Sequence, residues 1–125
     1  MAKILVIEDE AAIRANLRRL LTAEGYEVVC AADGAAGVRT AAHEQPDVVL
    51  CDVLMPVMDG YGVLAALRQS PETARIPFIF LTASADRADR RLALDHGADE
   101  YITKPFKLQD VLAAIKRKLP AAGST

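Results

Sequence analysis

Short apolar runs alternate with segments of helical periodicity along the chain, and this alternation limits the possible folds more than any other feature. The apolar runs predict five strands, at residues 4–7, 27–31, 47–51, 78–81 and 100–102. Apolar side chains recurring every three or four residues predict helices at residues 13–24, 35–43, 61–69, 86–96 and 108–119. Strands that alternate with helices are typical of βαβ units around a parallel sheet.

The expected fold is an α/β doubly wound, flavodoxin-like sheet of five parallel strands in the order 2-1-3-4-5, with five helices. We expect one domain over residues 1–119, followed by a tail or the start of a linker at residues 120–125. In the first helix, Arg14, Arg18 and Arg19 lie opposite the apolar stripe and are expected to face solvent. The helix at 86–96 has the weakest apolar stripe, so we expect it to move most readily.

Charge and hydropathy exclude several classes of function. The 125 residues carry a formal net charge of -2, so the chain has no broad basic surface for direct binding of nucleic acid. No stretch approaches the roughly 20 apolar residues of a membrane span, and the first residues lack the apolar run of a signal peptide. We expect a cytoplasmic protein, and its partner could be another protein or a small anion.

The two cysteines, Cys30 and Cys51, could form a disulfide, hold a metal or react as thiols, but no further cysteine or nearby histidine completes a metal-binding pattern. In the expected strand order the first strand lies between the two strands that carry the cysteines. These two strands are then about 9.5 Å apart, at ~4.8 Å for each step between neighbouring strands. A disulfide needs Cα atoms within about 7 Å, so we expect two reduced, packed thiols. His43 and His96 have no motif around them and are expected at the surface.

Polar residues gather where the predicted strands end, which is where open α/β sheets place their sites. Glu8 and Asp9 follow the first strand, Asp52 the third, Thr82 the fourth, and Lys104 comes shortly after the fifth. Taken singly, each residue has an ordinary explanation: acids suit a helix N-terminus, threonine a strand end, and lysine a solvated surface.

Their joint placement favours a single site. Because the first and third strands are expected to be neighbours, Glu8, Asp9 and Asp52 would repel one another unless a cation lay between them, and hard carboxylate oxygens suit Mg²⁺. A metal, an ammonium group and a hydroxyl around one carboxylate form an arrangement that neutralises a phosphoryl group during transfer. Asp52 is then the candidate nucleophile.

Four segments in this order and spacing resemble response-regulator receiver domains of two-component signalling, over residues 3–119. These segments are residues 4–10 (ILVIEDE), 47–52 (DVVLCD), 55–60 (MPVMDG) and 97–106 (GADEYITKPF). The resemblance implies a signalling domain that catalyses its own phosphorylation and dephosphorylation. It implies a sensor histidine kinase or histidine phosphotransfer protein as phosphoryl donor and a downstream protein as target.

The resemblance also assigns roles to single residues. It implies that Glu8 and Asp9 serve the metal together with Asp52 and the carbonyl group of Leu54, with Mg²⁺ as cofactor. It implies Asp52 as phosphoacceptor, Lys104 as the base that pairs with the phosphate, Thr82 as switch hydroxyl and Tyr101 as switch aromatic. It further implies a cis peptide bond between Lys104 and Pro105.

The expected output is a change in the surface formed by the fourth helix, fifth strand and fifth helix, although Tyr101 could also be a fixed core residue. Whether the chain stays a monomer or forms a phosphorylation-dependent dimer is left open by the sequence. Leu54 and Ser84 offer little to hold an attacking water, so we expect slow self-dephosphorylation.

Two other classes of protein share some of these features. A small aspartyl-nucleophile phosphatase or phosphotransferase usually carries a second acid two residues after the nucleophile, where this chain has Leu54. A flavodoxin-like FMN carrier would have a phosphate-cradling loop after the first strand, where this chain has acids.

Overall fold

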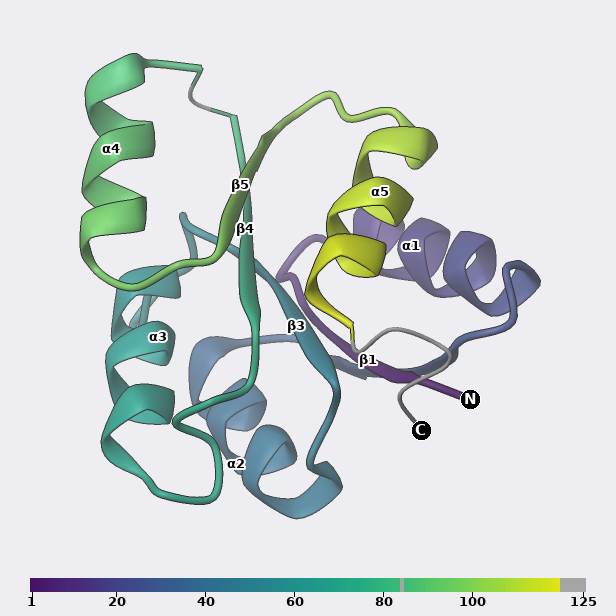
Figure 1. Ribbon diagram of the computed structural model, residues 1–125, viewed down its shortest axis with the longest axis horizontal. Coiled ribbons are helices and arrows are strands. Elements are labelled where there is room, and N and C mark those ends of the chain that lie inside the picture. Colours follow the sequence, from purple (N-terminus) through teal and green to yellow (C-terminus); the bar gives the residue numbers. More distant parts are fainter. Residues whose placement is uncertain (84, 120–125) are drawn as a thin grey trace.

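A parallel five-stranded sheet runs through the middle of the computed structural model, which describes residues 1–83 and 85–119 (Figure 1). The strands are β1 (Lys3–Ile7), β2 (Glu27–Ala31), β3 (Val48–Asp52), β4 (Phe78–Thr82) and β5 (Glu100–Thr103), in the order β2-β1-β3-β4-β5. The helices are α1 (Ala11–Ala23), α2 (Gly34–Glu44), α3 (Gly60–Gln69), α4 (Arg87–Asp95) and α5 (Leu108–Lys118). The fold class and strand order predicted from the sequence are confirmed.

The sheet is covered on both faces, because successive side chains of a strand point to opposite sides. Alternate strand residues such as Leu5, Val49 and Phe78 pack with α2, α3 and α4 on one face. Their neighbours, such as Ile4 and Leu50, pack with α1 and α5 on the other face. This explains why β3 and β4 are buried at every position.

Three strands, β3, β4 and β5, end one residue later than the apolar runs indicated, and the added residues are polar. Asp52 ends β3, where it pairs with Leu81, while Thr82 ends β4 and pairs with Thr103. A polar side chain ends an apolar run in the sequence, whereas the backbone hydrogen bonding of the strand continues. Two of the candidate site residues are therefore held by the sheet itself.

Both cysteines are free thiols, as predicted, and β1 lies between the strands that carry them. Burial raises the pKa of the Cys30 thiol and raises that of Cys51 well above its usual range, so both are protonated at neutral pH. His43 and His96 are exposed. The prediction for residues 120–125 lies outside the described residues.

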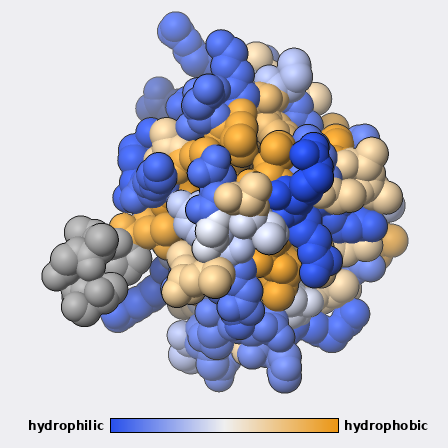
Figure 2. Space-filling view, turned by 90° about the vertical axis from the view of Figure 1, so that its right-hand side faces the viewer, coloured by the Kyte–Doolittle hydropathy of each residue, from blue (hydrophilic) through white to orange (hydrophobic). Residues whose placement is uncertain are grey.

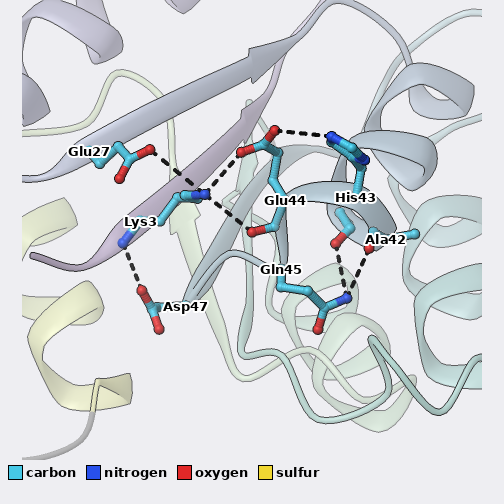
Figure 3. Close-up of polar contacts among 8 residues, drawn as sticks. Lys3, Glu27, Ala42, His43, Glu44, Gln45 and Asp47 are labelled. Atoms are coloured by element: carbon cyan, nitrogen blue, oxygen red, sulfur yellow. Dashed lines mark hydrogen bonds and ion pairs between the residues drawn. The ribbon is translucent and has the colours of Figure 1, made fainter.

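A polar cluster around Lys3 joins four elements at the sheet edge where the strands begin (Figure 3). The Lys3 ammonium lies 2.9 Å from the Glu44 carboxylate and 3.7 Å from that of Glu27, and the backbone amide of Lys3 donates to Asp47 at 2.7 Å. The hydrogen bond from Lys3 lowers the pKa of Glu44. The cluster ties β1 to β2, α2 and the start of β3, at the edge opposite the polar strand ends.

Among the described residues, no helix combines the length and the apolar character that crossing a membrane requires.

Gly60 is the tightest point between α3 and the sheet. A Cβ there would lie 2.5 Å from the Asp52 carbonyl oxygen and 2.7 Å from the Phe80 ring. We predict that Gly60→Ala lowers the free energy of unfolding by about 1–3 kcal/mol, because a backbone atom has to shift. Urea denaturation followed by circular dichroism measures this.

Gly62, two residues along the same helix, provides the matched control. The nearest atom to a Cβ there would belong to the flexible Met58 side chain, at 2.9 Å, and the Asp59 carboxylate would lie at an ordinary contact distance of 3.8 Å. Gly62→Ala should leave stability unchanged or raise it by up to about 1 kcal/mol through helix propensity. Equal effects of the two substitutions would contradict the close-approach explanation.

Candidate functional site

Three carboxylates meet at the carboxyl edge of the sheet. Glu8 and Asp9 directly follow β1, and Asp52 is the last residue of β3. Ile7 pairs with Cys51 in the parallel register, so the next residues, Glu8 and Asp52, lie beside each other. One carboxylate oxygen from each of the three acids lies within 4.8 Å of the other two. The structure thus brings together the acids that the sequence analysis grouped.

Lys104 reaches this cluster from the loop after β5. Its ammonium nitrogen lies 2.7 Å from Glu8 Oε1 and 3.4 Å from Asp52 Oδ2. Its backbone amide donates to the Thr82 carbonyl, and the Lys104–Pro105 peptide is cis, as the resemblance implied. One ammonium group therefore contacts two carboxylates that would otherwise repel each other.

Burial sets the electrostatics of the site. Glu8 has no exposed surface, and this burial, together with the charge of Asp52, raises its pKa although Lys104 and the Glu10 amide oppose the shift. Burial alone would lower the pKa of Lys104, but hydrogen bonding to Glu8 and the charges of Glu8 and Asp52 raise it overall. Lys104 consequently remains a cation at neutral pH.

The sequence left open whether Glu8 and Asp9 serve the helix that follows them. Glu8 Oε2 accepts a hydrogen bond from the backbone amide of Glu10, the N-cap residue of α1, at 3.1 Å, while Glu10 itself makes no side-chain cap. One oxygen of Glu8 thus supports the helix entry and the other holds Lys104. Asp9 is exposed beside them.

Thr82 and Tyr101 are both buried and lie at a neighbouring cavity of about 220 Å³. Leu54 also lines this cavity, although 72% of its surface is exposed. The sequence analysis missed Tyr61, Asp89 and Leu92, which complete the lining together with Val53. No local motif marks these residues, because they come from α3 and α4 and meet only in the folded chain.

The prediction for the first helix was wrong for Arg14. It was expected to face solvent with Arg18 and Arg19, but it is only half-exposed and donates from Nη1 to the Glu8 carbonyl at 2.8 Å. The apolar stripe of a helix identifies the buried face, but it does not reveal a charged residue that bends back to the preceding loop.

Comparison with known families identifies this arrangement. Residues 4–116 match the response regulator receiver domain. The chain belongs to this family. The receiver domain is a phosphoacceptor domain of two-component signalling, and receiver domains interact with histidine kinases. The family does not favour the phosphatase alternative.

Individual relatives agree with this assignment. The receiver domain is 46% identical over 117 residues to a probable transcriptional regulator, ycf27, of Cyanophora paradoxa, covering 94% of this chain and 48% of the relative. It spans about half the length of the curated relatives it matches.

Solved structures show the same fold. Chemotaxis protein CheY4 of Vibrio cholerae superposes with a TM-score of 0.90 at 33% identity, over 95% of this chain and 99% of that one. The receiver domain of the sensor histidine kinase PA1611 from Pseudomonas aeruginosa PAO1 superposes with a TM-score of 0.86 at 34% identity, over 94% and 96% of the two chains. That structure holds a magnesium ion in its active-site cleft.

We predict that Lys104→Met lowers the free energy of unfolding by roughly 2–4 kcal/mol at pH 8 without metal, because it leaves the buried Glu8 carboxylate without its cation. The pKa of Glu8 in the folded protein then rises further above its unfolded value, so the folded state binds the additional proton. The deficit should therefore shrink as the pH falls from 8 toward 5. Urea denaturation across this range measures it.

The double variant Glu8→Gln, Lys104→Met serves as the control, since it removes the buried charge as well. It should lose most of this pH dependence. A Lys104→Met deficit that stays constant from pH 8 to pH 5 would show that Glu8 does not cause it.

Proposed function

We propose that this receiver domain accepts a phosphoryl group on Asp52 and passes the signal on as a change of surface shape. The supporting observation is the surroundings of Asp52, a carboxylate on a residue only 6% exposed, with an ammonium group 3.4 Å away and two further carboxylates beside it. In the transfer, a carboxylate oxygen of Asp52 forms a bond to phosphorus. The bond between phosphorus and the histidine nitrogen of the donor protein breaks. Lys104 balances the added negative charge.

Mg²⁺ is the proposed cofactor, and the residues present fit it. Glu8, Asp9 and Asp52 supply hard oxygen ligands within 4.8 Å of one another, which suits a small divalent cation. The carbonyl group of Leu54 is the fourth proposed protein ligand. A bound Mg²⁺ would supply positive charge to the transferred phosphoryl oxygens.

The proposed donor is a sensor histidine kinase or a histidine phosphotransfer protein. A groove of about 580 Å³ runs between α1 and the loop that leads to α5. Its lining consists of Ala12, Ile13, Asn16, Lys104, Pro105 and Phe106. This side of the molecule exposes apolar surface among hydrophilic side chains (Figure 2). Because Lys104 belongs to both the groove and the site, a donor seated in the groove would contact the residue whose ammonium group lies 3.4 Å from Asp52.

Thr82 and Tyr101 are the proposed switch. Tyr101 lines the 220 Å³ cavity beside Thr82, and it also lines a second groove of about 350 Å³ over β5 and α5. A movement of Thr82 toward a phosphoryl group on Asp52 would change the space available to Tyr101, and a new position of Tyr101 would change the groove. A downstream protein, or a second copy in a phosphorylation-dependent dimer, would detect this surface.

We predict that acetyl phosphate with Mg²⁺ adds the mass of one phosphoryl group to the wild-type protein and none to Asp52→Asn. Intact mass spectrometry measures the gain, and omission of Mg²⁺ should abolish it. Asp95→Asn, which removes an exposed carboxylate of α4, is the matched control and should be labelled like the wild type. Equal labelling of Asp52→Asn would refute the assignment.

The duration of the signal depends on Leu54. Self-dephosphorylation needs a water molecule held in line with the bond to phosphorus, and an exposed leucine has no group that could hold one. Ser84, the other residue assigned to this path, lies outside the described residues. We therefore propose that this receiver domain loses its phosphoryl group slowly.

We predict that Leu54→Asn speeds decay of the phosphorylated protein by about 10-fold at saturating Mg²⁺, because an amide can position the water. Since Leu54 is largely exposed, the substitution should cost little stability. Mass spectrometry after removal of acetyl phosphate gives the decay rate. Leu54→Ala is the control, because it opens the same space without adding a polar group. Similar decay in both variants would indicate that steric access, and not water positioning, sets the rate.

A further inference from the structure

Arg14 joins the first turn of α1 to the loop that carries two of the three clustered acids. Its Nη1 atom donates to the Glu8 carbonyl at 2.8 Å and, more weakly, to the Asp9 carbonyl at 3.5 Å. Its own backbone amide donates to the Glu10 carbonyl at 3.0 Å. Arg14 is half-exposed, with its guanidinium group directed back over the loop that precedes the helix.

The Arg14 guanidinium group bonds to the backbone carbonyls of the acidic loop and not to its carboxylates. In residues 1–83 and 85–119, the carboxylates of Glu8 and Asp52 form their ion pairs with Lys104 and not with Arg14. An arginine paired with these carboxylates would occupy the oxygens that a metal needs. Arg14 adds no further contact to these oxygens and holds the backbone that carries them.

The loop needs such a tie because its acids repel one another. Besides the contact of Glu8 with Lys104, the loop is anchored by the hydrogen bond from the Glu8 amide to the Ala31 carbonyl and the bond from the Glu10 amide to the Glu8 carboxylate, both 3.1 Å long. The second of these anchors uses a site oxygen. Arg14 fixes the two carbonyls without doing so.

We infer that Arg14 is a positioning residue: its guanidinium group holds the Glu8–Asp9 backbone so that both carboxylates converge with Asp52 on a divalent cation. This inference rests on the proposed Mg²⁺ site. It assigns to Arg14 no contact with the phosphoryl group or the metal.

A positioning role and a mere charge effect change Mg²⁺ affinity in opposite directions. Removing a cation near a metal site strengthens Mg²⁺ binding through electrostatics alone. Removing a residue that holds the ligands in place weakens binding, and loss of such supporting contacts typically costs 10–100-fold in metal affinity. The sign of the change therefore distinguishes the two.

The experiment compares Arg14→Met with Arg18→Met, which removes the same charge one turn further along α1, at an exposed position. Mg²⁺ titration by NMR or calorimetry should show about 10-fold weaker binding for Arg14→Met and wild-type or slightly tighter binding for Arg18→Met. Saturating Mg²⁺ should restore phosphorylation of Arg14→Met by acetyl phosphate. Affinity of Arg14→Met equal to or above that of the wild type would overturn the inference.

A second readout does not depend on the metal. Amide hydrogen exchange of residues 8–10 in metal-free protein should quicken in Arg14→Met and stay unchanged in Arg18→Met. Unchanged exchange in Arg14→Met would also overturn the inference. Failure of the wild type to bind Mg²⁺ at all would instead refute the proposed metal site, while the exchange measurement would still decide whether Arg14 holds the loop.

Arg14→Lys guards against a general loss of folding, since it keeps the charge and most of the aliphatic stem. A lysine ammonium ends a flexible stem and is not held in a rigid planar group as Nη1 is, so the Mg²⁺ affinity of Arg14→Lys should lie between those of the wild type and Arg14→Met. A wild-type affinity in Arg14→Lys, together with weaker binding by Arg14→Met, would show that an ammonium donor holds the two carbonyls equally well and would support the positioning role.

Discussion

The mutual repulsion of carboxylates at one edge of the sheet is the constraint on which the site depends. Glu8 and Asp52 end up side by side because β1 and β3 pair in parallel register. Glu8 is fully buried, so its charge would be costly without the Lys104 ammonium 2.7 Å away. One lysine cannot neutralise three acids, and the remaining negative charge is the reason for proposing a divalent cation at this site.

The rest of the fold keeps this unfavourable arrangement in place. β3 and β4 are buried at every position, so Asp52 and Thr82 stand at the ends of strands that cannot shift without exposing the core. At the opposite edge, Lys3 joins β1 to α2 and β3 through favourable pairs. Oppositely charged pairs thus hold one end of the sheet, while the other end carries three carboxylates with Lys104 as the cation that pairs with two of them.

The sequence was sufficient for the fold and for the grouping of the acids, because both follow from strand order. Apolar runs and helical periods predict five alternating strands and helices, for which this order is the common arrangement, and parallel strands bring residues such as Asp9 and Asp52 to the same edge. Arg14 was misplaced, since periodicity describes the face of a helix and not the direction in which a long side chain bends. The cavity beside Tyr101 was missed because its lining comes from separate elements without a shared motif.

The uneven anchoring of the helices suggests where a change at Asp52 would become visible. α1 and α5 bury leucine, valine and isoleucine side chains against the sheet, whereas Ala93 is the only buried residue among those described in α4. A helix held by one small side chain costs less to displace than one held by several large ones. Leu92 of α4 lines the same cavity as Thr82 and Tyr101, so the least anchored helix adjoins the proposed switch. A small movement at the site would therefore displace α4 and β5. The helices that bury large side chains against the sheet would stay in place.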